Sequence, residues 1–181
     1  MLALVAAAFA LDPYDTGRPG FFTKAGVRPQ GPRTAAASRG RDPAFDSAIF
    51  GNSHVQLLSP ERLGALGAGR FVSLIAPATR PREQLMLLDW FLRHRKSPPR
   101  AIVIGVDGYW CTGDAALPVD KPFPFWLYER SLKAYLSGLV RYDILEEAWR
   151  RIGFLLNRKA ERARPDGYWD YEANYIGLGY D

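Results

Sequence analysis

Residues that commonly build metal and redox sites are scarce in this chain of 181 residues. Cysteine occurs once, at Cys111, so an internal disulfide and a metal site built from several cysteines are both excluded. Histidine occurs twice, at His54 and His94, which limits any metal site that depends on imidazole ligands. We therefore expect the protein to use no metal and no other cofactor.

The sequence also lacks a concentrated run of basic residues. It has 24 Lys and Arg against 19 Asp and Glu, a net charge of +5 that is scattered along the chain. The one basic cluster, between Arg158 and Arg164, is interrupted by Glu161 and has no aromatic residues among its charges. Such a pattern does not favour nucleic-acid binding, which usually combines basic and stacking side chains. We interpret the charge as a solvated surface, with an anionic polymer or a membrane surface as the alternative partner.

The apolar run from Leu2 to Leu11 is too short to cross a bilayer, which needs about 20 residues. Its segment Ala8-Phe9-Ala10 fits the small-x-small pattern of a signal cleavage site, although no basic segment precedes the run. We interpret residues 1–11 as a truncated signal or membrane anchor, with a buried N-terminal segment as the alternative. Residues 12–44 include a stretch rich in Gly, Pro, Arg and Ala, which predicts a linker or an irregular arm.

The rest of the chain, residues 45–181, is expected to form one folded domain, since 48% of all residues are hydrophobic and 13% are aromatic. Short apolar runs alternate there with segments of helical pattern. The predicted strands cover residues 47–51, 71–76 and 101–106, and the first predicted helices cover residues 60–66 and 81–95. This alternation predicts an α/β fold with a short parallel sheet and flanking helices. Right-handed crossovers then bring all three strand ends to one edge.

Local signals define the helices further. Ser59 and Thr79 are the expected N-caps of the first two helices. In the second helix, the apolar stripe contains Leu85, Leu88 and Leu92, widened by Met86, Trp90 and Phe91. After a long loop over residues 108–124, two helical patterns at about 125–137 and 142–163 predict a helical C-terminal segment, and Pro165-Asp166-Gly167 predicts a turn.

The sequence Gly51-Asn52-Ser53-His54 follows the first predicted strand directly. Gly51 permits a tight turn where a larger residue would clash, and amides freed at the next helical turn can hold a negative charge. Ligands of open α/β sheets bind at the edge where the strands end. Ser53 is therefore our candidate nucleophile, and the alternative is that its hydroxyl caps the following helical turn.

With its place after a strand and before an α/β alternation, this four-residue motif resembles the first block of the SGNH (GDSL-type) hydrolase superfamily. The similarity is greatest to the SGNH-like proteins of bacterial envelopes, and it covers residues 12–107 and, more weakly, the remainder of the chain. It implies an SGNH/flavodoxin-like fold. It also implies a serine esterase or O-acyltransferase that acts on acyl esters of a cell-envelope polysaccharide or on a small ester. The implied location is the periplasm, or the membrane of the envelope through an N-terminal anchor.

The resemblance also implies roles for single residues. Ser53 would be the nucleophile, its own amide and one from the Ala78–Thr79 turn would hold the oxyanion, and Gly51, Asn52 and His54 would complete the oxyanion and substrate site. We expect His54 to line the cleft rather than to act as the base. Asp107 could orient a base or bind a substrate hydroxyl, and the alternative is a loop residue that accepts backbone hydrogen bonds.

The chain departs from the superfamily pattern in three places. Ala76-Pro77-Ala78-Thr79 stands where a glycine is expected, and Gly105-Val106-Asp107 stands where Gly-x-Asn-Asp is expected. The Asp-x-x-His that supplies the base is absent, so we expect the domain to be incomplete at its C-terminus, with the base beyond Asp181. A second hypothesis is a catalytically inactive SGNH-like module for envelope binding or assembly. A third is a flavodoxin-like nucleotide binder with phosphate at the turn of residues 52–54.

Overall fold

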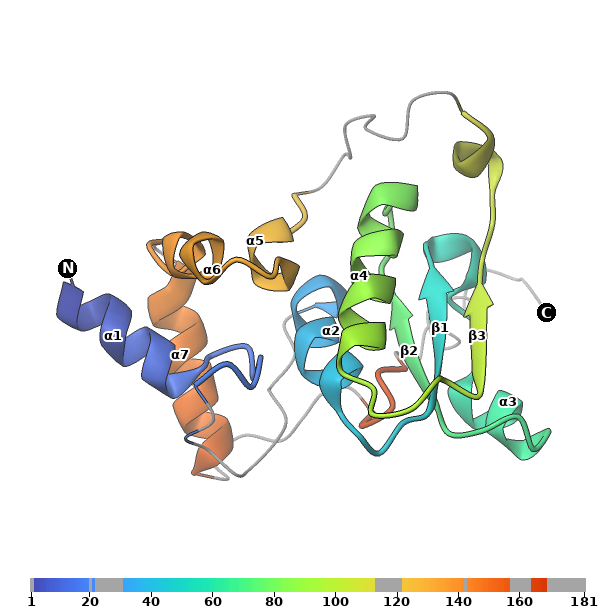
Figure 1. The fold of residues 1–181 in the computed structure, drawn as a ribbon, viewed down its shortest axis with the longest axis horizontal. Coiled ribbons are helices and arrows are strands. Elements are labelled where there is room, and N and C mark those ends of the chain that lie inside the picture. Colours follow the sequence, from blue (N-terminus) through green and yellow to red (C-terminus); the bar gives the residue numbers. More distant parts are fainter. Residues whose placement is uncertain are drawn as a thin grey trace, which may run out of the picture.

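The computed structural model describes residues 2–19, 21, 31–112, 122–141, 143–156 and 164–168. Within them, the chain forms an α/β fold around a parallel sheet of three strands, in the order β2-β1-β3 (Figure 1). The strands are β1 (Ser47–Gly51), β2 (Phe71–Ile75) and β3 (Ala101–Ile104). The prediction of a short parallel sheet with flanking helices and a helical C-terminal part is therefore confirmed.

Strand β1 lies in the centre of the sheet, where Phe50 is opposite both Leu74 of β2 and Ile104 of β3. Its five residues are all buried, as expected of a continuous apolar strand with neighbours on both sides. All three strands run in the same direction, so their carboxyl ends share one edge. The residues after Gly51, Ile75 and Ile104 are consequently gathered there.

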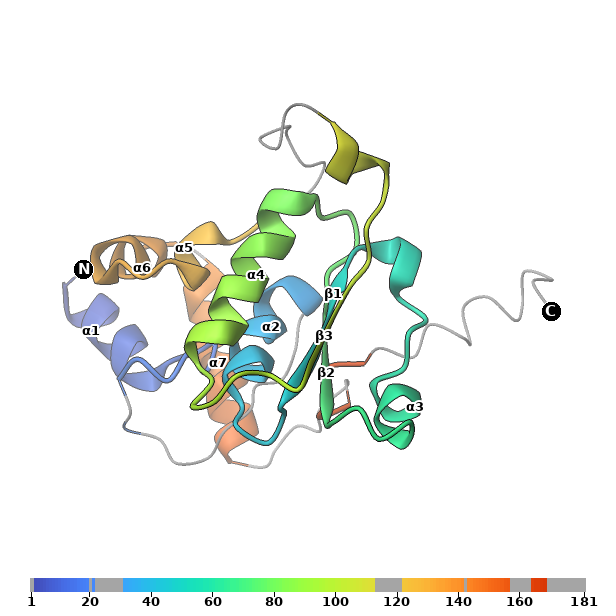
Figure 2. The ribbon, with the colours of Figure 1, turned by 45° about the vertical axis from the view of Figure 1, so that its right-hand side comes forward.

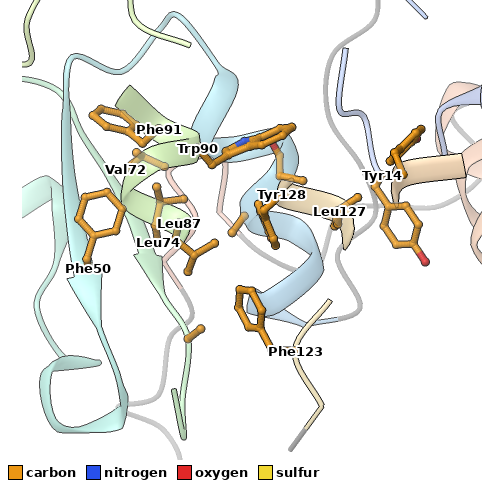
Figure 3. Close-up of a cluster of buried hydrophobic side chains, with 14 of the residues drawn as sticks. Tyr14, Phe50, Val72, Leu74, Leu87, Trp90, Phe91, Phe123, Leu127 and Tyr128 are labelled. Carbon is orange, nitrogen blue, oxygen red and sulfur yellow. The ribbon is translucent and has the colours of Figure 1, made fainter. Parts of the chain in front are cut away.

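Helices cover both faces of this sheet (Figure 2). Helices α2 (Pro32–Arg41) and α4 (Pro81–Arg93) cover one face, and the short helix α3 (Pro60–Ala65) covers the other. The larger core lies on the side of α2 and α4 (Figure 3); its labelled members are Tyr14, Phe50, Val72, Leu74, Leu87, Trp90, Phe91, Phe123, Leu127 and Tyr128. A smaller core on the α3 side contains Ile49, Phe71 and Ile75.

Helix α4 buries only part of the stripe that the sequence predicts. Phe91 is buried as predicted, but Leu85 and Leu92 are 48% and 41% exposed, and Leu87, which the stripe omits, is buried in the core. Trp90 is also buried and donates from Nε1 to the carbonyl of Ala37, 2.9 Å away. Because α4 contacts α2 as well as the sheet, its buried face is rotated toward α2, and the predicted leucine stripe is wrong at its two ends.

The N-cap of α4 is Arg80 and not Thr79. The Arg80 backbone N–H donates to the Glu83 carboxylate at 2.9 Å, so a side chain from the first turn satisfies this donor. At α3 the predicted cap is confirmed, since the Ser59 hydroxyl accepts from the Arg62 backbone N–H at 3.4 Å.

The prediction of an irregular arm over residues 12–44 is wrong for residues 32–41, while the described residues 12–19 form no helix or strand. Residues 32–41 form α2, and Ala35, Ala36 and Ala37 are buried against the core. Small side chains allow this helix to approach β2 and α4 closely. The segment after α1 also packs into the protein: Asp12 is 4% exposed and accepts from the Thr16 backbone N–H at 2.9 Å.

A second group of helices lies beside this α/β unit (Figure 1). It contains α1 (Leu2–Leu11), α5 (Phe125–Tyr128), α6 (Leu132–Gly138) and α7 (Asp143–Leu155). The single helix predicted over residues 125–137 is thus divided in two, because Ser131 caps a new helix by accepting from the Ala134 N–H at 3.2 Å. The predicted helical residues 142 and 157–163 lie outside the described residues.

Within this helical group, α1 packs against α6. Ala8 is buried, and the Phe9 ring meets the Tyr135 ring edge-on at a centroid distance of 6.1 Å. None of the helices in the described ranges has the length and apolar character that a membrane crossing requires. The interpretation of residues 1–11 as a truncated signal or anchor stays a prediction.

Candidate functional site

Two glycines and a valine shape the carboxyl edge of the sheet. β1 ends at Gly51, which has φ +156°, and the 3-10 turn Ser53–Val55 follows. A Cβ at Gly51 would lie 2.3 Å from Val55 Cγ2, and a Cβ at Gly105 would lie 2.6 Å from Val55 Cγ1. Val55 therefore fills the space that the two glycines leave, and this packing brings the turn after β1 next to the segment after β3.

Asn52 connects the ends of all three strands from a buried position. It is the N-cap of the 3-10 turn, where its Oδ1 accepts from the His54 backbone N–H at 3.0 Å. Its Nδ2 donates to the Asp107 carboxylate after β3 and, at 3.4 Å, to the Thr79 carbonyl after β2. With only 5% of its surface exposed, Asn52 is a positioning residue whose donors and acceptor are already in use.

His54 and Asp107 form a pair at this edge. His54 Nδ1 lies 3.3 Å from Asp107 Oδ2, and Asp107 Oδ1 accepts from the Tyr109 backbone N–H at 3.0 Å. The side chain of Asp107 is 12% exposed and that of His54 is 68% exposed. A nearly buried carboxylate thus holds one nitrogen of an imidazole that is open to solvent. This contact sets Nδ1 of the ring against the carboxylate.

Ser53 lies next to this pair and is exposed. Its hydroxyl and its backbone N–H form no hydrogen bond with any residue in the described ranges. The alternative prediction, that Ser53 caps the following helical turn, is wrong, because Asn52 caps the 3-10 turn and Ser59 caps α3. The Ser53 hydroxyl is consequently free to contact a ligand.

Thr79 does not provide the oxyanion donor that the sequence analysis expects of it. Its N–H donates to the Ala76 carbonyl at 3.3 Å, and its hydroxyl donates to the same oxygen at 2.6 Å. The Thr79 amide is therefore not free for an oxyanion, and the residue acts on the site by holding Asn52 through its carbonyl. Ala78, with φ +57°, has a backbone N–H that donates to no described residue. In this turn the available donor is Ala78.

Sequence reasoning did not identify Val55 or Arg80 as parts of this edge. The Arg80 guanidinium lies 4.7 Å from the centroid of the Tyr109 ring, which is 43% exposed. This pair adds a cation and an aromatic face to the segment that carries Asp107. No pattern in the sequence indicates it, since Arg80 and Tyr109 belong to separate turns.

His94, the other histidine, lies far from this edge at the C-terminal end of α4, as its C-cap. Its Nδ1 is 2.7 Å from the Trp90 carbonyl, and its ring contacts the Trp90 indole at a centroid distance of 4.4 Å, with the two planes tilted by 47°. Burial lowers the pKa of His94 below its ordinary value, and the nearby arginines lower it further. In the described part of the chain, no three His, Cys, Asp or Glu side chains converge to hold a metal ion.

Comparison with known protein families, with curated proteins and with solved structures finds no match to this chain.

Proposed function

We propose that the protein is a serine esterase or O-acyltransferase of the SGNH type, acting on acyl esters of a bacterial envelope polysaccharide. The observation that carries this proposal is the free Ser53 hydroxyl beside the His54–Asp107 pair, at the edge where parallel strands end. That edge is where open α/β sheets bind their ligands. The strand order β2-β1-β3 supports the flavodoxin-like topology that the resemblance implies.

In this mechanism the Ser53 oxygen attacks the ester carbonyl and its proton passes to unprotonated His54, directly or through one water. The Ser53 and Ala78 amides stabilise the oxyanion, and Asp107 stabilises the imidazolium that forms. Collapse of the intermediate expels the alcohol, which takes the proton from His54 and leaves an acyl-serine. Water completes hydrolysis, and a sugar hydroxyl completes acyl transfer.

This assignment makes His54 the base, in place of the cleft-lining role expected from the sequence. The geometric argument is the 3.3 Å approach of Asp107, because a carboxylate on one imidazole nitrogen leaves the other for proton transfer. A histidine beyond residue 181 stays the alternative base. Arg80 and the exposed Tyr109 ring support a polysaccharide substrate, since a ring face and a cation suit sugar rings that carry acidic groups.

A fluorophosphonate probe tests the proposal because it labels activated serines. We expect labelling of the purified protein, loss of labelling in Ser53→Ala, and a strong decrease in His54→Gln. The matched control is Ser137→Ala, an exposed serine on α6, which should label like the original protein. Labelling that survives in Ser53→Ala would refute the nucleophile, and labelling unchanged in His54→Gln would favour a base elsewhere.

The second candidate is a catalytically inactive binding or assembly module of the envelope. It is favoured by one observation: in the described structure the Ser53 hydroxyl donates no hydrogen bond to His54. Under this hypothesis the protein binds the polysaccharide, Ser53→Ala binds it equally well, and neither protein reacts with the probe. Membrane anchoring through the N-terminus and a periplasmic location remain predictions under both candidates.

A further inference from the structure

A second site candidate lies at the other end of α4 from Ser53. It is a pocket of about 380 Å³, lined by Thr16, Gly17, Arg18, Trp90, Arg93, His94 and Arg130. Helix α4 begins just after β2 at the carboxyl edge and runs back along the sheet (Figure 1). Its last turn, which carries Trp90, Arg93 and the C-cap His94, therefore faces away from the proposed esterase site. Ligand binding in this pocket would not depend on Ser53 or on the proposed esterase activity.

The pocket has an excess of positive charge. Three guanidinium groups and one imidazole line it, and none of its described lining residues is acidic. The Asp89 carboxylate contacts two of the cations from outside the lining, at 3.5 Å from Arg93 and 2.6 Å from Arg130. A second carboxylate, that of Asp12, acts on Arg18 from outside the lining, so three arginines less two carboxylates (3 − 2) leave about one positive charge before the histidine is counted.

Arg18 is held in place by its surroundings and forms no ion pair with a residue in the described ranges. Its guanidinium donates to the Glu129 carbonyl and lies 4.6 Å from the centroid of the Tyr135 ring. Buried Asp12 attracts it electrostatically, but that carboxylate already accepts from Thr16 and Gly17. Arg18 Nε is buried and has no hydrogen-bond partner among the described residues.

Arg93 is also fixed, and it is close to other cations. It donates to the Tyr128 carbonyl, and its guanidinium lies 4.6 Å from the centroid of the Trp90 ring. Burial lowers the pKa of Arg93; Asp89 opposes this change, and the charges of Arg130 and Arg18 add to it. The lining cations are thus near enough to repel one another, and an anion between them would relieve that repulsion.

We propose that this pocket binds the phosphate group of a small organic phosphate. Guanidinium groups that converge from the N-terminal arm, from α4 and from the loop before α6 can each donate to a different phosphate oxygen. A phosphate group offers more acceptor oxygens to three guanidinium groups than a single carboxylate does. The volume also exceeds what phosphate alone needs and falls in the range of pockets for small molecules.

Binding is tested by calorimetry with inorganic phosphate and with glycerol 3-phosphate, using chloride at the same ionic strength as the reference. A parallel arm uses vesicles of phosphatidylcholine with and without phosphatidic acid, so that a lipid headgroup is distinguished from a free phosphate. The main variant is Arg130→Gln, whose side chain is 71% exposed and can be replaced without opening the core. The matched control is Arg70→Gln, which makes the same charge change at an exposed position outside the pocket.

We expect saturable phosphate binding that is about tenfold weaker or more in Arg130→Gln, as the loss of a charge-assisted hydrogen bond implies, and unchanged in Arg70→Gln. Arg93→Gln should weaken binding similarly, with its fold checked by circular dichroism because Arg93 also contacts Tyr128. Vesicle binding that needs phosphatidic acid and is lost in Arg130→Gln would identify a lipid source of the phosphate. Absence of saturation in every arm, or equal weakening by Arg70→Gln, would overturn the proposal.

Discussion

Replacing Gly51 with alanine should disturb the carboxyl edge more than any other single methyl group there. The added Cβ would lie 2.3 Å from Val55 Cγ2, far inside ordinary contact distance, and φ +156° is unfavourable for alanine. Overpacking costs about 1–3 kcal/mol, and the backbone strain adds about 1 kcal/mol. We therefore expect Gly51→Ala to lower the free energy of unfolding by about 2–4 kcal/mol, which a domain of ordinary stability survives.

The steric part of this cost can be separated from the backbone part. Gly67 also has positive φ, +79°, but a Cβ there would meet nothing within 4 Å, so Gly67→Ala measures strain without a clash. In a Val55→Ala background the clash disappears, and Gly51→Ala should then cost about as little as Gly67→Ala. The expected coupling between Gly51→Ala and Val55→Ala is about 1–3 kcal/mol in favour of the double variant.

Urea denaturation of the four proteins in this cycle, together with Gly67→Ala, gives the free energies directly. Two results would refute the reasoning: a cost for Gly51→Ala no greater than that for Gly67→Ala, or a cost that Val55→Ala fails to reduce. Probe labelling of Ser53 provides a functional readout. Because Val55 follows Ser53 in the same 3-10 turn, labelling should fall in Gly51→Ala and partly recover in the double variant.

Three further predictions concern charge and packing elsewhere. Burial, more than any neighbouring charge, raises the pKa of Glu147 from an ordinary 4.5 to about 7. The contribution of protonated Glu147 to folding is therefore complete below pH 4.5 and is lost as pH rises to about 7. Glu147→Gln should thus raise the free energy of unfolding by about 2–3 kcal/mol at pH 8 but little at pH 4. If the free energies of unfolding of the two proteins, measured in urea, changed in parallel with pH, this prediction would be contradicted. Asp107→Asn removes the carboxylate that contacts His54, so probe labelling should fall about tenfold or more. Because one amide oxygen replaces two carboxylate oxygens that accept from Asn52 and Tyr109, the melting temperature should also fall, and undiminished labelling of the folded variant would exclude this role. Gly138→Ala places a Cβ 2.1 Å from the Trp126 ring and should cost about 1–3 kcal/mol in thermal or urea unfolding, and a neutral effect would show that α5 and α6 can separate freely.

The sheet could be predicted because its signal is local. Each strand is a continuous apolar run, and each crossover contains a segment of helical pattern, so the direction and the shared edge of the strands follow from general rules. The Ser59 cap was predictable for the same reason, since a cap depends on a few neighbouring residues. The strand ends thus predict that Ser53 and Asp107 lie at one edge of the sheet.

Features that depend on contacts between distant segments could not be predicted. Helix α2 has the sequence PRTAAASRGR, which contains no large apolar side chain, and its burial arises from the close approach that alanine permits. The buried face of α4 depends on the same contact, because Trp90 reaches the Ala37 carbonyl of α2. The sequence of α4 alone cannot show which of its side chains α2 will cover, because the sequence of α2 itself resembles a linker.

The same distinction between local and long-range features applies to the candidate site. Topology alone brings the turn after β1 and the segment after β3 together, but the pairing of His54 with Asp107 requires the registration that Val55 gives by filling the space beside Gly51 and Gly105. Valine is an ordinary core residue, and no spacing rule identifies it as the contact that aligns two loops. The sequence therefore indicated the residues of the site and left their pairing undetermined.

The pairing also changes the meaning of Asp107 as a departure from the superfamily pattern. An asparagine expected near this position would donate to the oxyanion, which an ionised carboxylate cannot do. Asp107 instead contacts His54 and accepts from Asn52, whose own amide is thereby occupied. If the enzyme proposal holds, oxyanion stabilisation must come from backbone amides such as those of Ser53 and Ala78, while Asp107 acts on the base. Under the enzyme proposal, Asp107 cannot act as an oxyanion donor but does contact the proposed base, so the absence of the asparagine in the SGNH pattern does not by itself argue against catalysis.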